Sequence, residues 1–158
     1  MNRKDREITE IAGIEDIIKS CKVMRLAMAA NGAPYVVPLN FGYEITGSQL
    51  TLYFHCAAKG QKTDIIKKNP RICFEMDAEF GYVGQDYQAC KYSYRYSSVI
   101  GFGQAVEVFG REKDKGLLLL MKNVAGGKDK PYVFDPKTVE RTSVYKIVSN
   151  DFTAKSTQ

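Results

Sequence analysis

The sequence predicts a mainly β protein with peripheral helices, built as an antiparallel sheet or a closed barrel. Two observations lead there. Most strand-like segments follow one another directly, and short turns such as Asn31-Gly32 and Gly47-Ser48 join them. A doubly wound fold would instead alternate its strands with crossover helices. With 158 residues, we expect one domain, 1–158, whose core is large enough to need no disulfide.

The first half of the chain is predicted to contain a helix, three successive strands and a second helix. Ile11, Ile14 and Ile18 lie at helical spacing among charged residues, which indicates an amphipathic helix. Pro38 interrupts the second strand and indicates an edge, a bulge or an opening of the ladder. Pro70 ends the second helix. The predicted segments are helices at 9–21 and 57–69 and strands at 23–30, 35–45 and 50–56.

The second half is predicted in the same way. The stretch 80–91 is rich in Gly and Tyr and aperiodic, so we expect a loop or hairpin there. Gly126-Gly127 should end the leucine-rich helix, and the tail after Asp151 is polar. The predicted segments are strands at 71–77, 92–109 and 143–148, a helix at 111–124 and one helical turn at 136–141.

Composition excludes several classes of protein. The chain is 44% hydrophobic and 26% charged, with a net charge of +5, so it is neither disordered nor collagen-like. A single His excludes a multi-histidine metal site within one chain, and four Cys without a CxxC pair make a zinc site unexpected. We therefore predict no metal.

Targeting signals are not expected either. The N-terminus, MNRKDREITE, lacks the apolar core of a signal peptide. The longest apolar run, 117–121, is far too short to span a membrane. We expect a cytoplasmic protein with reduced thiols and no membrane partner.

The first candidate site segment is 36–43. Pro38 removes one backbone donor from its strand, and Asn40 adds an amide with two donors and an acceptor. Such a segment is either an ordinary edge strand or a place where free backbone groups bind a planar ligand.

The second segment, 54–62, joins a strand to a helix. Gly60 lets the backbone approach a ligand closely, and Lys59 and Lys62 flank the start of the helix. Basic residues oppose the dipole at a helix N-terminus unless an anion is bound, so the segment is either a phosphate site or a solvated basic turn.

His55 and Cys56 are neighbours in this segment. Adjacent residues on a strand point to opposite faces, which argues against a Cys–His nucleophile. A lone His at a strand end is either a structural hydrogen-bonding residue or an acid that works near neutral pH.

The third segment, 92–103, alternates Tyr with Arg95 and Ser. Ser97 and Ser98 either form an ordinary polar strand face or meet a ligand or another subunit. Stacking of single-stranded nucleic acid on the tyrosines is a weaker alternative, because no basic stripe accompanies them. We expect no nucleic-acid partner.

Taken in order, these segments resemble the flavin-mononucleotide (FMN) split-barrel proteins related to pyridoxamine 5'-phosphate oxidase. More narrowly, they resemble the nitroimidazole-resistance (Nim) group. The motifs that carry the resemblance span nearly the whole chain: 3–8 (RKDREI), 37–43 (VPLNFGY), 52–55 (LYFH), 59–62 (KGQK), 68–71 (KNPR), 96–103 (YSSVIGFG) and 140–142 (ERT).

The resemblance implies a single FMN-binding split-barrel domain that forms a homodimer, with the cofactor at the subunit interface and a small-molecule substrate. His55 would lie near the flavin as the catalytic residue, because the Nim group is thought to reduce nitroimidazoles by paired electron transfer. Cys56 counts as a cofactor contact, although a hydroxyl residue would be a better phosphate donor. The other implied contacts are the backbone of Val37, Pro38, Leu39 and Asn40 at the ring, Lys59, Gly60 and Lys62 at the phosphate, and Ser97 and Ser98.

Two functions fit these features. The first is an FMN-dependent oxidoreductase of the nitroreductase type, in which flavin holds the two electrons that side chains cannot. The second is a split barrel that binds flavin, deazaflavin or haem without turnover, with His55 as the axial ligand of haem.

Overall fold

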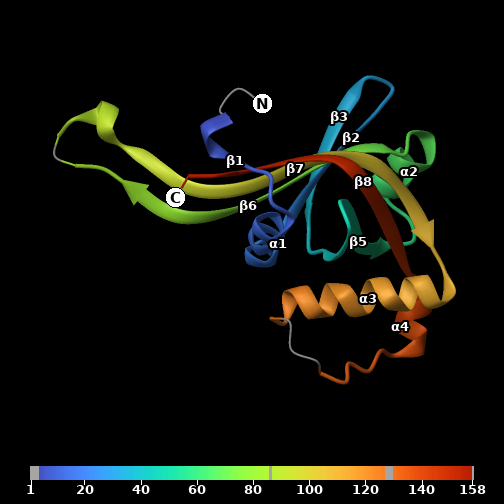
Figure 1. Ribbon diagram of the computed structural model, residues 1–158. Coiled ribbons are helices and arrows are strands. Elements are labelled where there is room, and N and C mark those ends of the chain that lie inside the picture. Colours follow the sequence, from blue (N-terminus) through green and yellow to red (C-terminus); the bar gives the residue numbers. More distant parts are fainter. Residues whose placement is uncertain (1–3, 86, 127–129, 158) are drawn as a thin grey trace.

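The computed structural model describes residues 4–85, 87–126 and 130–157. Arg3 and Gly127, which belong to motifs named above, lie outside these residues. The described strands form one antiparallel sheet in the order β3-β2-β6-β7-β8-β5-β4, with β1 paired to β8 (Figure 1). The strands are β1 (Glu7–Ile8), β2 (Met24–Ala30), β3 (Ala33–Leu39), β4 (Gly42–Thr46), β5 (Gln49–Ala57), β6 (Arg71–Val83), β7 (Ser93–Val108) and β8 (Thr142–Ser156).

Four α-helices within the described residues pack against this sheet, which confirms the predicted class and all four predicted helices. They are α1 (Ile11–Ser20), α2 (Gln61–Lys68), α3 (Gly110–Val124) and α4 (Pro136–Arg141), with short 3₁₀ turns at Lys4–Arg6 and Ala89–Lys91. α2 begins later than predicted, at Gln61, because β5 continues through the small residues that follow His55. No helix within the described ranges is long and apolar enough to cross a membrane.

The prediction of one strand over 35–45 is wrong. The segment forms two strands at opposite edges of the sheet: β3 pairs only with β2, and β4 only with β5, among the described strands. The chain leaves the sheet between them at Asn40, whose Nδ2 donates to the carbonyl of Lys22 at 2.8 Å. Pro38 lies within the edge strand β3 opposite Arg25, the kind of position where a missing N–H is tolerated.

Two strands are longer than predicted. The tail expected to be only polar is part of β8, which pairs with β7 as far as Ser156. β6 continues through 78–83 and forms a long hairpin with β7 that projects from the body (Figure 1). In the tail of β8, Asn150, Asp151 and Thr153 are exposed while Ala154 is buried, and the residues of 78–83 are exposed or half-buried. Backbone pairing to neighbouring strands therefore outweighs the local polarity.

The two faces of β7 differ in what covers them. Val99 and Ala105 point inward and are buried in the core. The alternate residues Ile100, Phe102 and Val106 point outward and are exposed at 40%, 54% and 54%. We call this the outer face. The sheet therefore leaves the outer face uncovered around Phe102, whereas α3 and α4 cover the same face at Val108 and Val144.

Candidate functional site

One edge of β3 is open. β3 ends the sheet, so within the described residues only β2 pairs with it. The backbone groups that point away from β2 are thus available to a ligand. Val37, Pro38 and Leu39 all lie on this strand. The structure therefore places the predicted ring-binding stretch on a free backbone edge.

Asn40 and His55 lie just beyond the same end of the β4–β5 ladder. The β4–β5 ladder starts with the pair Gly42 and Tyr53, and Asn40 and His55 each lie two residues beyond that pair. One N–H of the Asn40 side-chain amide donates to the Lys22 carbonyl, and this bond holds the amide at the end of β3. Its carbonyl oxygen keeps its acceptor capacity for a ligand.

His55 and Cys56 point to opposite faces of β5, as predicted. His55 is exposed and pairs with Val144 of β8, which in turn pairs with Val108 of β7. Residues directly opposite one another across a ladder share a face. His55 therefore opens onto the outer face, whereas Cys56 is half-buried and packs against the core.

The pKa shifts of these two residues fit their surroundings. Partial desolvation, and then the positive charge of Lys62, lower the pKa of His55, so the neutral imidazole is favoured. Burial raises the pKa of the Cys56 thiol although Lys62 opposes it. The thiol is therefore protonated at neutral pH, which argues against a Cys nucleophile.

The start of α2 is suited to an anion. Gly60 stands before the helix with φ of +152°, and no side chain caps the N-terminus. The hydroxyl of Thr63 donates to the Gly60 carbonyl at 2.7 Å, so it leaves the first-turn N–H groups uncapped. A Cβ at Gly60 would meet nothing within 4 Å, so the space above the turn is open.

Two lysines complete this turn. Lys59 is exposed, and the Nζ of half-buried Lys62 lies 5.8 Å from the centroid of the Phe54 ring. Uncapped N–H groups and two ammonium groups together match the chemistry of a phosphate dianion. The residues present therefore fit the phosphate of a flavin nucleotide.

Ser97 and Ser98 do not join this group within one chain. Ser97 is buried, and its hydroxyl bonds that of Ser156 at 2.9 Å, whereas Ser98 faces outward and is half-buried. His55 pairs at the beginning of β8 and Ser97 at its end, a distance of roughly 40 Å along the strand. Only a second copy of the chain could bring Ser98 to His55.

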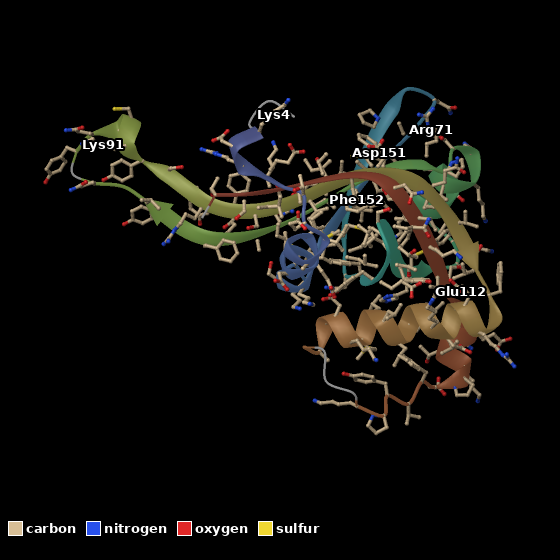
Figure 2. All side chains as sticks on the ribbon, in the orientation of Figure 1. Lys4, Arg71, Lys91, Glu112, Asp151 and Phe152 are labelled. Carbon is tan, nitrogen blue, oxygen red and sulfur yellow. The ribbon has the colours of Figure 1, made fainter. Side chains whose placement is uncertain are left out.

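A groove on the outer face was not predicted. It has a volume of about 580 Å³ and joins β2, β6 and β7 beside the C-terminal end of α2. Arg71, Cys73 and Phe102 are among its lining residues, and Arg71 is among the side chains labelled in Figure 2. The alternation of β7 could have placed Phe102 on one face, but only the three-dimensional sheet shows that no helix covers it.

Solved structures share this architecture. A candidate 5-nitroimidazole antibiotic resistance protein from Bacteroides thetaiotaomicron is 28% identical, with a TM-score of 0.77 over 95% of this chain and 86% of that one. The flavocytochrome Anf3 from Azotobacter vinelandii is 18% identical, with a TM-score of 0.78 over 100% and 72%. A protein described as binding FAD and heme, from Mycobacterium smegmatis, is 17% identical, with a TM-score of 0.76 over 97% and 74%. At these identities the last two show the shared fold alone.

The family comparison covers nearly the whole chain. A search of curated proteins finds no match. Residues 10–156, by contrast, match the family described as pyridoxamine 5'-phosphate oxidase. This match and the Bacteroides structure confirm the resemblance that the sequence motifs indicated. The chain is a split barrel that belongs to the pyridoxamine 5'-phosphate oxidase family.

Proposed function

We propose that the chain is an FMN-dependent oxidoreductase that reduces nitro compounds such as nitroimidazoles, in the cytoplasm. One observation carries the proposal: the uncapped start of α2, with Lys59 and Lys62, lies beside an exposed His55 near the end of β5. The similarity to a candidate 5-nitroimidazole resistance protein supports this substrate class.

Each element has a separate task in this proposal. The α2 turn holds the phosphate, and the free edge of β3 bonds the polar edge of the ring. FMN supplies, when bound, the two-electron chemistry that side chains cannot. His55, on the outer face, would orient the substrate, and the imidazolium form that it takes up by binding a proton from solvent would pass that proton to the substrate.

The proposal includes a homodimer. Ser98 lies far from His55 in one chain, so a complete site needs the Ser98 of the partner subunit. The apolar outer face supports this arrangement, because a second copy would cover Ile100, Phe102 and Val106.

An absorption spectrum of the purified protein tests the proposal first. FMN bands should appear, and the protein should be a dimer by light scattering. Under anaerobic conditions NADPH or NADH should bleach the flavin bands, and a nitroimidazole should restore them with formation of reduced drug. A protein that refuses FMN, or whose reduced flavin does not react with the drug, would refute the proposal.

A second function is flavin, deazaflavin or haem binding without turnover. The specific observation that favours haem is the exposed, neutral imidazole of His55, which can serve as an axial ligand. A Soret band that disappears in His55→Ala, in place of flavin bands, would establish this function.

A further inference from the structure

We propose that Lys22 and Asn123 are positioning residues for the cofactor. Together they hold the chain between β3 and β4 so that the side-chain amide of Asn40 presents its oxygen to the flavin ring. The connecting residues 40–42, called the crossover, lead from one edge of the sheet to the other. This inference rests on the proposed FMN site, but it needs no second copy of the chain.

The ammonium group of Lys22 joins the C-terminal ends of two helices. Its Nζ donates to the carbonyl of Lys19, in the last turn of α1, at 3.0 Å. The same Nζ donates to the backbone carbonyl and the side-chain oxygen of Asn123, in the last turn of α3, at 2.9 and 3.3 Å (Figure 1). Helix C-termini carry partial negative charge, so a cation between them is stabilised. These three acceptors match the three N–H donors of an ammonium group, which makes Lys22 a clamp between the helices.

Asn123 is the buried half of this clamp. Only 7% of the residue is exposed. Its Nδ2 donates to the carbonyl of Phe41 at 3.0 Å and to that of Cys21 at 3.4 Å, while its Oδ1 accepts from Lys22. A buried amide of this kind holds its partners in one arrangement, because a shift would leave buried polar groups without hydrogen bonds. Asn123 therefore fixes Phe41 relative to the end of α1.

Each residue of the crossover is held by a contact from outside it. The side chain of Asn40 donates to the carbonyl of Lys22 at 2.8 Å. Phe41 is fully buried in the core, and its carbonyl accepts from Asn123. Gly42 lies directly against α3, since a Cβ there would come within 2.3 Å of a backbone nitrogen of that helix. Lys22 and Asn123 thus supply two of the three contacts that fix the crossover.

The bond to Lys22 also sets the orientation of the Asn40 amide. A backbone carbonyl accepts hydrogen bonds and cannot donate them, so the NH₂ group of Asn40 must face Lys22. The amide oxygen is then turned away from Lys22, on an exposed residue at the end of the open edge of β3. A flavin carries one N–H on the polar edge of its ring, and an acceptor held in place complements it. Such preorganisation gains affinity because the side chain is not ordered at the expense of binding.

A double-mutant cycle on FMN affinity tests the inference. Lys22→Met removes the ammonium group and keeps the carbonyl that Asn40 bonds. It should raise the FMN dissociation constant about fivefold, and Asn40→Ala should raise it about tenfold. In the Asn40→Ala background, Lys22→Met should change the constant less than about twofold, because the residue through which Lys22 acts is gone. Effects that multiply to about fiftyfold would overturn the proposal.

A neighbouring lysine provides the matched control. Lys19→Met removes the same charge one turn earlier and keeps the carbonyl that Lys22 bonds. The Lys19 side chain forms ion pairs with Glu15 and Asp16 of its own helix, so its loss should leave the FMN dissociation constant within about twofold. Equal weakening in Lys19→Met and Lys22→Met would show a general effect of charge and would overturn the positioning role.

The spectrum of bound FMN provides a readout that does not depend on affinity or turnover. At saturating FMN, Asn40→Ala should change the visible circular dichroism of the flavin, because the ring loses a hydrogen bond. Lys22→Met and Asn123→Ala should change it in the same direction, and Lys19→Met should keep the wild-type spectrum. Variants of Lys22 and Asn123 that lose stability but keep the wild-type spectrum would refute the positioning role.

The outcomes separate this inference from the proposed function. A wild-type protein that does not bind FMN would refute the proposed function itself. A protein that binds FMN, with an affinity that Lys22→Met leaves unchanged, would refute the positioning role alone. Asn123 is buried, so if Asn123→Ala does not fold, the cycle at partly exposed Lys22 still decides.

Discussion

The strongest test of the site replaces Lys59 and Lys62 together by Ala. These lysines flank an uncapped helix start, where positive charge is unfavourable unless an anion is bound. If the anion is the FMN phosphate, the double substitution should weaken FMN binding far more than it changes the stability of the apoprotein. The loss of FMN affinity should be large, and the change in apoprotein stability should be small.

The loss in binding comes from two charge-assisted hydrogen bonds. Half-buried Lys62 should contribute about 2 kcal/mol to phosphate binding. Lys59 is exposed, and solvent screening reduces its share to about 1 kcal/mol. The sum, about 3 kcal/mol, corresponds to a roughly 100-fold rise in the dissociation constant of FMN.

The stability of the apoprotein should hardly change. Removing two cations from the start of a helix gains roughly 0.3 kcal/mol each. Losing the ammonium group of Lys62 over the Phe54 ring costs about 0.5 kcal/mol. These contributions nearly cancel, so urea unfolding of the apoprotein should shift by less than about 0.5 kcal/mol.

The assay is fluorescence titration of apoprotein with FMN at fixed ionic strength. The matched control is Lys67→Ala with Lys68→Ala, which removes the same charge from the last turn of the same helix. The control should leave the FMN dissociation constant within about threefold, because only distant charge is lost. Equal losses in the two double variants, or less than threefold weakening in Lys59→Ala, Lys62→Ala, would refute the phosphate assignment.

Four further predictions concern single residues. Because the folded state lowers the pKa of His55, the unfolded chain binds more protons near pH 6. In urea unfolding, the free energy of unfolding of the wild-type protein should therefore fall relative to that of His55→Gln as the pH drops through ~6.5. Above about pH 7.5 the difference between the two proteins should stay constant. Tyr53→Phe should lower the free energy of unfolding by about 1.5 kcal/mol, because the buried hydroxyl donates to Glu112 at 2.7 Å. This loss should shrink as acid protonates the Glu112 carboxylate, and an equal loss at pH 3 and pH 7 would contradict the prediction. Gly42→Ala should destabilise by at least about 2 kcal/mol, since its Cβ would lie 2.3 Å from a backbone nitrogen of α3, and a neutral effect would show that α3 packs elsewhere. Phe102→Glu should convert the proposed dimer to a monomer in light scattering while the apoprotein stays folded by circular dichroism. A variant that stays dimeric would show that the interface lies on another face.

Local patterning predicted much of the fold. The 3.6-residue repeat of Ile14 and Ile18 located α1, and turn signals such as Asn31-Gly32 located the β2–β3 hairpin. Asn31 and Gly32 both adopt positive φ there, as that turn requires. The prediction of Gly60 at the junction before α2 depended on a local backbone signal of the same kind.

Features that depend on distant neighbours were missed. Nothing near Asn40 in the sequence shows that β3 and β4 lie at opposite edges of the sheet, because a carbonyl 18 positions away fixes that crossing. The polar end of β8 is a strand because β7 and β1 pair with it on its two sides. Exposure of Phe102 likewise depends on which helices cover which face, and composition carries no signal of that.

The two faces of the sheet are therefore under different constraints. The inner face must bury Val99 and its neighbours in the core of one chain. The alternation of inward and outward residues along each strand is enough to meet this requirement. The outer face carries His55, Ser98 and Phe102, residues with no shared local purpose in a single copy. In the proposed dimer, a phosphate turn and a histidine from one subunit would meet a serine from the other. Assembly would then be a condition of cofactor binding, because neither copy alone would hold the complete set of contacts.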